Sequence, residues 1–155
     1  MADKNQDKNQ SKNRAEQAEE HDESVLNPEI KNESDLSKKE RRLIEKEKLK
    51  GMGVSYCATC DGAFFRNKVT AVVGGGNVAL EDAIFLSRMC KKVYLIHRRD
   101  EFRGAKILQD EVKKNDKIEI LWNTIVKKID GDEVVEGLHI QDVDNHVDKL
   151  LDVDG

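Results

Sequence analysis

The chain of 155 residues has few aromatic residues, a single proline and only three cysteines. No apolar run approaches the length of about 20 residues that a transmembrane helix needs. The N-terminus lacks the apolar core of a secretory signal, and three cysteines are too few for a disulfide framework. These absences predict no membrane association and favour a reducing compartment, so we expect a cytoplasmic location.

Positive charge is not in excess either. The 27 basic and 31 acidic side chains give a net charge of −4. Nucleic-acid-binding domains usually carry a clustered basic face. We therefore expect no nucleic-acid partner.

The composition changes near residue 50. Residues 1–50 contain 13 acidic and 12 basic side chains and no glycine, cysteine or aromatic residue. Such a segment has too little apolar surface to offset the entropy of ordering. Residues 51–155 hold every glycine, cysteine and aromatic residue, and their number is typical of one small domain. We predict a charged tail over residues 1–50 and one globular domain over residues 51–155.

The end of the tail carries a helix signal. Ser37 and Glu40 have the spacing of a capping box, and Gly51 is a typical helix stop. The tail is therefore predicted to be disordered at first and then helical over residues 38–50. Two interpretations are open: the helix binds a partner through its few apolar residues, or it is simply solvated. These apolar residues are Leu36, Leu43, Ile44 and Leu49.

Short apolar runs alternate with amphipathic stretches in the first part of the domain. Residues 69–73 and 93–96 are typical of buried parallel strands, and residues 118–122 alternate as a third strand. Helices are predicted over about residues 77–90 and from Asp100, which can cap the second helix. The inner stripe of this second helix is predicted to be Phe102, Ala105, Leu108 and Val112.

From residue 124 onward, apolar and polar residues alternate with a period of two. Residues 124–130, 133–142 and 147–153 are predicted strands, and the Asp-Gly pair after the first is a hairpin signal. The order is β-α-β-α-β followed by a three-stranded antiparallel meander. We predict an α/β, Rossmann-like domain.

A glycine-rich turn joins the first predicted strand to the first helix. Its G-x-G-x-x-A spacing is that of a dinucleotide fingerprint, in which the first glycine makes the turn and the second lets the backbone approach a diphosphate. The amide groups at the helix N-terminus then face the diphosphate. The alternative is a turn that holds no ligand. The residues assigned to the cofactor are Gly74, Gly75, Gly76, Asn77, Val78 and Ala79.

The end of the second predicted strand is basic. NAD sites usually carry an acidic residue here, which holds the ribose 2′-hydroxyl. In this chain His97, Arg98 and Arg99 stand at that place, followed by Arg103. Guanidinium groups hold a 2′-phosphate through forked hydrogen bonds, whereas a carboxylate would repel it. We predict NADPH rather than NADH; a solvated basic turn is the alternative.

Cys57 and Cys60 form a C-x-x-C motif that is followed by Asp61. This spacing allows a disulfide that opens easily, and Asp61 is placed to exchange a proton with a leaving thiolate. A structural zinc ion would need two further ligands at suitable spacing, so we expect no metal. Inert cysteines are the remaining alternative. Cys90 stands alone and is predicted to be a packed thiol.

Together these motifs resemble one family. Residues 53–62, with the sequence GVSYCATCDG, look like the active-site stretch of the low-molecular-weight, bacterial-type thioredoxin reductases. Residues 74–79 and 97–103 are similar to the NADPH site of that family. The resemblance runs from about Gly51 to Gly155. It implies a flavoenzyme in which NADPH reduces FAD, the flavin reduces the disulfide and the dithiol reduces thioredoxin.

The resemblance also implies roles for single residues. Cys60 would face the flavin, Cys57 would attack the disulfide of thioredoxin, and Asp61 would be the acid/base. Arg98 and Arg103, helped by His97 and Arg99, would hold the 2′-phosphate. The family works as a homodimer, and its NADPH domain rotates so that nicotinamide and dithiol take turns at the flavin.

In that family the NADPH domain is inserted into an FAD domain. Residues 1–50 do not resemble the FAD half and contain no flavin G-x-G-x-x-G, and Gly155 precedes the returning FAD segment. We therefore expect a domain truncated at its C-terminus, with most of the FAD site absent and little or no turnover. The alternatives are an NADPH-binding interaction module without catalytic activity and a marginally stable, non-functional product.

Overall fold

The computed structural model describes residues 46–155. The helix predicted over residues 38–50 lies largely outside the described residues, and within them residues 46–48 are helical. In this described part, no helix is long and apolar enough to cross a membrane.

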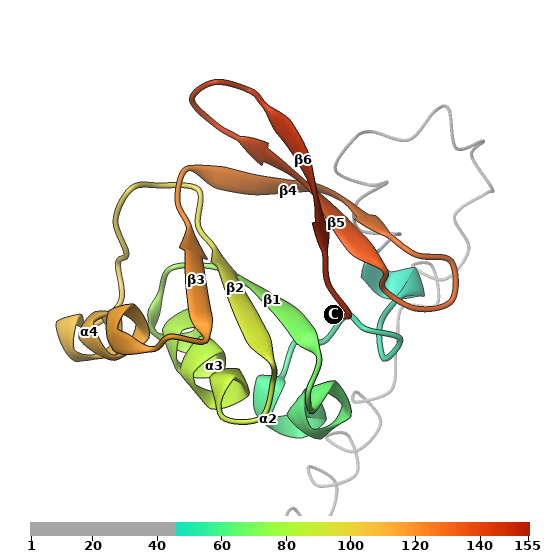
Figure 1. Cartoon of the computed structure of the whole chain (residues 1–155), viewed down its shortest axis with the longest axis horizontal. Coiled ribbons are helices and arrows are strands. Elements are labelled where there is room, and N and C mark those ends of the chain that lie inside the picture. Colours follow the sequence, from blue (N-terminus) through green and yellow to red (C-terminus); the bar gives the residue numbers. More distant parts are fainter. Residues whose placement is uncertain (1–45) are drawn as a thin grey trace, which may run out of the picture. The chain divides into compact units, whose positions relative to one another are not determined.

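A parallel sheet of three strands, in the order β1-β2-β3, forms the first layer (Figure 1). The strands span Val69–Val73, Lys92–Ile96 and Ile118–Leu121. Val69 lies opposite Lys92, and Val93 lies opposite Ile118. The β-branched residues favour extended backbone and pack well on a sheet. The apolar runs therefore predicted these strands correctly.

Two helices pack on this sheet, α3 (Asn77–Ser87) and α4 (Lys106–Lys114). α3 ends at Ser87 rather than near Cys90, because the Ser87 hydroxyl donates to the carbonyl oxygen of Ile84 at 2.7 Å and so competes with the helical ladder. The buried residues of this core are Leu80, Ala83, Ile84, Leu86, Cys90, Val93, Leu95, Phe102, Val112 and Ile118. The prediction of Cys90 as a packed thiol is confirmed, and burial raises the pKa of that thiol.

The prediction of a helix from Asp100 is wrong, since α4 begins at Lys106. The backbone N–H groups of Arg103 and Gly104 both donate to the carbonyl oxygen of Gly75, at 2.8 and 3.0 Å. Amide groups that are used in this way cannot join a helical ladder. The loop before α4 is therefore held against the glycine turn, and Asp100 lies exposed in it.

An antiparallel sheet in the order β4-β5-β6 confirms the predicted meander. Its strands span Thr124–Asp130, Gly137–Asp142 and Asp148–Asp152. β5 begins at Gly137 rather than at residue 133, because Gly131 turns the chain with a φ of +135°. The Glu136 N–H donates to the Asp130 carbonyl oxygen at 2.9 Å and closes this turn. A side chain at position 131 would collide with the Val134 backbone.

A second core joins residues of both sheets. Its buried members are Leu49, Ile96, Val135, Leu138, Ile140 and Val153. Leu49, which the sequence placed in the tail, is only 2% exposed. It therefore belongs to the packed domain and is not available to a partner in the way that a solvated helix face would be.

The last residues of the chain run beside the parallel sheet. The Asp154 N–H donates to the carbonyl oxygen of Val69, and the Ala71 N–H donates to that of Gly155, both at 2.8 Å. Figure 1 shows the C-terminus next to β1. Backbone groups on the outer edge of β1 are thereby satisfied.

We expect Leu49→Ala to lower the free energy of unfolding by about 2–5 kcal/mol, because a buried leucine is replaced by a cavity. Ile107→Ala is the control, since Ile107 is 76% exposed. Urea unfolding of the two variants measures the difference. Equal midpoints would contradict the placement of Leu49 in the core.

Candidate functional site

The three glycines at positions 74–76 connect the end of β1 to the start of α3. A Cβ on Gly74 would lie 2.6 Å from the Cβ of Ala79, and one on Gly75 would run into the His97 ring. A Cβ on Gly76 would meet no atom within 4 Å. The protein therefore fills the space beside the first two glycines and leaves it open in front of Gly76, where a ligand can approach the backbone.

A depression of about 560 Å³ lies at this turn. It is lined by residues 72–79, Asp82 and Arg103. Gly76, Asn77 and Val78 are exposed there. Burial, and to a smaller extent the Glu81 carboxylate, raise the pKa of Asp82. The depression thus combines backbone amides, a guanidinium group and a carboxyl whose charge is disfavoured.

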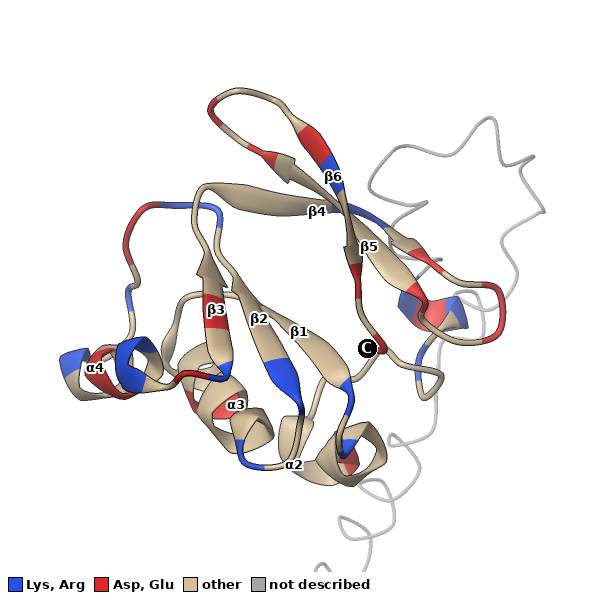
Figure 2. Ribbon diagram, in the orientation of Figure 1, with Lys and Arg blue, Asp and Glu red and all other residues tan. Residues whose placement is uncertain are grey.

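The loop after β2 brings basic side chains to the same place. Arg98, Arg99 and Arg103 are exposed, and within residues 46–155 none of them forms a salt bridge. Figure 2 shows basic and acidic segments in this loop, between β2 and α4. Asn77 Oδ1 accepts a hydrogen bond from the Ala105 N–H at 2.7 Å, which ties the end of the loop to α3.

His97 is placed differently from the arginines that follow it. Its side chain is 7% exposed, and Nε2 hydrogen-bonds to the carbonyl oxygen of Glu101 at 2.9 Å. The ring lies beside Gly75 and 5.5 Å from the ring centroid of Phe102. His97 therefore supports the turn and the loop from inside, and its assignment to a phosphate stays a prediction.

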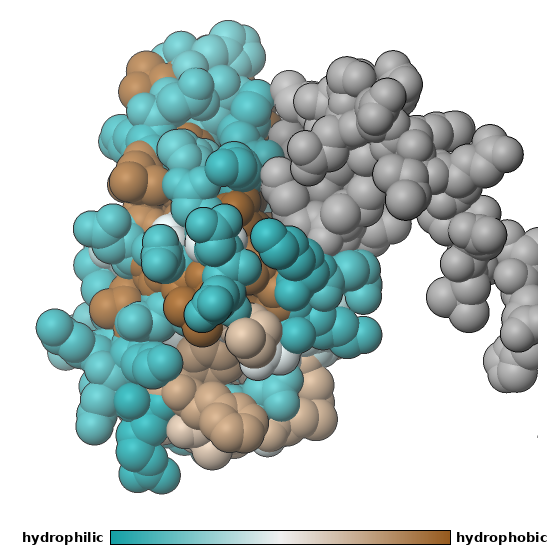
Figure 3. Space-filling model, turned by 90° about the vertical axis from the view of Figure 1, so that its right-hand side faces the viewer, coloured by the Kyte–Doolittle hydropathy of each residue, from teal (hydrophilic) through white to brown (hydrophobic). Residues whose placement is uncertain are grey.

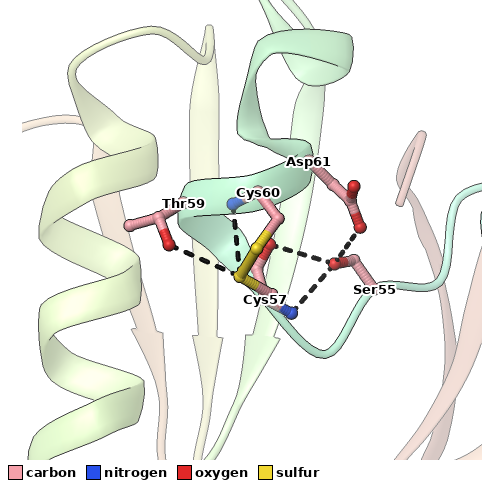
Figure 4. Close-up of a disulfide and its surroundings, with 5 residues drawn as sticks. All are labelled: Ser55, Cys57, Thr59, Cys60 and Asp61. Atoms are coloured by element: carbon pink, nitrogen blue, oxygen red, sulfur yellow. Dashed lines mark hydrogen bonds between the residues drawn. A yellow bond between two sulfur atoms is a disulfide. The ribbon is translucent and has the colours of Figure 1, made fainter.

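Cys57 and Cys60 form a disulfide, with 5.3 Å between their Cα atoms. Cys57 precedes the short helix α2 (Ala58–Asp61), and its Sγ accepts a hydrogen bond from the Cys60 N–H at 3.2 Å (Figure 4). A 3₁₀ turn, Gly62–Phe65, follows. Cys60 is exposed and Cys57 is half-buried, so a reductant or a partner thiol can reach the pair.

Ser55 connects the parts of this motif and was not among the predicted site residues. Its Oγ donates its one proton to Asp61 Oδ2 at 2.6 Å, lies 3.2 Å from the Cys57 carbonyl oxygen, and accepts from the Cys57 N–H at 3.0 Å (Figure 4). A serine two residues before a polar helix start is a known local hydrogen-bonding pattern, and this signal could have identified it.

Both motifs open onto one cavity of about 700 Å³. Cys57, Gly74, Gly75, Arg98 and Arg103 are among its lining residues. The structure therefore brings together the disulfide and the predicted nucleotide site. In residues 46–155, no group of three His, Cys, Asp or Glu side chains gathers that could hold a metal ion.

Exposed apolar side chains flank the disulfide in the sequence. Tyr56 is 62% exposed and Phe64 is 75% exposed. Figure 3 shows apolar residues exposed among hydrophilic ones on one side of the domain.

The sequence model of the pyridine nucleotide-disulphide oxidoreductases matches residues 69–146, which hold the glycine turn and the basic loop. The chain belongs to this family. It is 50% identical to the thioredoxin reductase of Mycolicibacterium smegmatis over 109 residues, which are 70% of this chain and 35% of that protein. It is 46% identical to the thioredoxin reductase of Rickettsia conorii, over 73% of this chain and 37% of that protein.

Solved structures agree with this relationship. The thioredoxin reductase from Streptococcus pyogenes MGAS5005 matches with a TM-score of 0.69 at 44% identity, over 71% of this chain and 36% of that chain. The resemblance and the α/β fold that the sequence predicted are therefore confirmed. The chain spans about a third of the length of the relatives that it matches.

We expect Ser55→Ala to speed hydrogen exchange at the Cys57 amide by about fivefold, because one hydrogen bond of about 1 kcal/mol is lost. The Val93 amide, which donates to the Lys117 carbonyl oxygen at 2.9 Å, serves as an internal control. Exchange measured by NMR would contradict the role of Ser55 if the Cys57 amide were unaffected or if both amides changed equally.

Proposed function

We propose that this chain is the NADPH-binding and redox-disulfide domain of a thioredoxin-disulfide reductase. The observation that carries the proposal is that Cys57, the first two glycines of the turn and two arginines line the same cavity. The similarity to thioredoxin reductases at 46–50% identity supports it. The proposed domain covers residues 51–155, with residues 1–50 as a charged tail.

NADPH fits the residues at the turn. The open space in front of Gly76 lets the diphosphate reach the amide groups at the start of α3, where the helix dipole favours negative charge. Arg98, Arg99 and Arg103 carry the positive charge that a 2′-phosphate requires. When bound, NADPH supplies a hydride. Asn77, Val78 and Ala79 complete the proposed site at the diphosphate, and His97 holds the turn and the loop together.

The Cys57–Cys60 pair is proposed to be the group that exchanges electrons with the disulfide of thioredoxin. The reduced pair carries two electrons, and the Cys57 thiolate attacks one sulfur of the thioredoxin disulfide, whose bond breaks while the leaving sulfur takes a proton. The Cys60 sulfur then attacks the Cys57 sulfur of the mixed disulfide. This step releases the second thioredoxin thiol and forms the Cys57–Cys60 disulfide again. Asp61, held by Ser55, is proposed to exchange the protons.

A protein partner suits the surroundings of the disulfide. The exposed Tyr56 and Phe64, which are close to the two cysteines in the sequence, offer apolar surface to thioredoxin. A dithiol that supplies electrons is kept reduced in the cytosol, and we therefore propose a cytoplasmic location. The resemblance extends the proposal to a homodimer in the assembled enzyme.

FAD is the second cofactor that the resemblance implies. The glycine turn of the described residues is already assigned to NADPH. This chain corresponds to about a third of its relatives' length, and we propose that the remaining part of such a protein forms most of the flavin site.

Arg98→Ala and Arg103→Ala are each expected to weaken NADP⁺ binding by about 10- to 100-fold, because a charge-assisted contact is worth about 1.5–3 kcal/mol. NAD⁺ binding should stay nearly unchanged. Isothermal titration of both nucleotides measures this. Arg66→Ala is a matched control, because Arg66 is exposed and lines neither cavity. Equal losses for both nucleotides would argue against the 2′-phosphate assignment.

The 155-residue chain is expected to bind NADPH but to retain no FAD. The experiment mixes the chain with FAD, removes free flavin by gel filtration and records the visible spectrum before and after anaerobic addition of NADPH. Retained flavin that bleaches would show a complete redox site in this chain and would contradict the expectation.

A further inference from the structure

The two sulfur atoms of the disulfide have unequal hydrogen bonding. Cys57 Sγ accepts from the Cys60 N–H at 3.2 Å, and Thr59 Oγ1 lies 3.4 Å from the same sulfur (Figure 4). A disulfide sulfur carries no proton, so the Thr59 hydroxyl is the donor. Among residues 46–155, no hydrogen bond reaches Cys60 Sγ. Both donors therefore point at one sulfur of the pair.

These hydrogen bonds to Cys57 Sγ differ in strength between the oxidised and the reduced pair. A disulfide sulfur is a weak acceptor, whereas a thiolate is charged and accepts strongly. Donors that already point at Cys57 Sγ in the oxidised state therefore stabilise the negative charge that appears when the bond opens. The donors are therefore already beside this sulfur when the charge develops.

Thr59 is suited to this task by its place in the fold. Its side chain is exposed on α2, and within the described part of the chain its hydroxyl has no other hydrogen-bond partner. The hydroxyl can therefore follow Cys57 Sγ when the sulfur atoms separate. The Cys60 N–H is a backbone group, so Thr59 is the one side chain in this motif through which a substitution can change the hydrogen bonding of Cys57 Sγ.

We propose that Thr59 is a catalytic residue whose hydroxyl stabilises the thiolate of Cys57 in the reduced pair. This inference rests on the proposed function of the pair as a redox dithiol. It makes Cys57 the more acidic thiol and the nucleophile, and it leaves Cys60 as the protonated partner.

The chemical step balances without further groups. A dithiol reductant such as dithiothreitol supplies two electrons and two protons and is itself oxidised to a cyclic disulfide. The Cys57–Cys60 bond breaks, Cys60 keeps one proton, and the other is released to solvent from Cys57. The Cys57 thiolate then attacks the methylene carbon of iodoacetamide, a carbon–sulfur bond forms, and iodide leaves with the electron pair of the broken carbon–iodine bond.

Other charges also act on Cys57. Asp61 is linked to it through Ser55, and the charged side chains that line the same cavity are Lys46, Asp82, Arg98, Arg103, Lys127 and Lys128. All of these remain in place when Thr59 alone is changed. A comparison of Thr59 variants therefore isolates the contribution of the hydroxyl.

The test is the pH dependence of iodoacetamide alkylation of the reduced full chain, after anaerobic removal of dithiothreitol. Mass spectrometry of the peptides separates Cys57, Cys60 and the buried Cys90. Thr59→Val removes the hydroxyl at nearly constant volume. We expect it to move the midpoint of the Cys57 profile to higher pH by about one unit, which corresponds to one charge-assisted hydrogen bond. Thr59→Ser, which keeps the hydroxyl, should restore the midpoint.

The Cys60 profile is the internal control, because a change in overall structure would move both profiles. The proposal is overturned if Thr59→Val leaves the Cys57 midpoint in place, or if Thr59→Ser moves it as far as Thr59→Val does. The measurement needs no nucleotide, flavin or thioredoxin. A failure of NADPH binding would count against the proposed function, while the alkylation profiles would still decide the role of Thr59.

Discussion

The carbonyl oxygen of Gly75 accepts two hydrogen bonds, from the N–H groups of Arg103 and Gly104, and the arrangement of the proposed nucleotide site depends on them. They hold the loop after β2 against the glycine turn, although the two segments are almost thirty residues apart in the sequence. The buried His97 ring packs beside Gly75 and bonds to the Glu101 carbonyl oxygen. The exposed arginines of the loop are therefore presented beside the amide groups of α3.

The position of the disulfide depends on a different set of contacts. The segment that leads to Cys57 is fastened to the meander by the hydrogen bond from the Val135 N–H to the Met52 carbonyl oxygen, at 3.0 Å. Gly53 lies so close to Val135 that a Cβ there would approach it to 2.7 Å. On the other side, Gly62 lies against α3, where a Cβ would be 3.0 Å from the Phe85 ring. The motif is thus held between the meander and α3, and Cys57 lines the cavity that Arg98 and Arg103 share.

Within the motif, the hydroxyl groups of Ser55 and Thr59 contact different atoms. Ser55 binds the Asp61 carboxylate and both backbone groups of Cys57, while Thr59 approaches only the sulfur of Cys57. Both hydroxyls therefore contact Cys57 and neither contacts Cys60, although the C-x-x-C spacing alone does not tell the two cysteines apart. The exposed surface of Tyr56 and Phe64 adjoins this motif in the sequence.

The sequence by itself determined the β-α-β-α-β order, the meander, the family, and the burial of Cys90. Hydrophobic period, glycine spacing and turn chemistry are local properties, and each was readable from neighbouring residues. Tertiary structure alone decided where α4 begins, because the amides of Arg103 and Gly104 bond to a distant carbonyl. It also decided that Leu49 is buried, that the His97 ring lies inside, and that Ser55 holds Asp61. Each of these depends on contacts between elements, which no local pattern records.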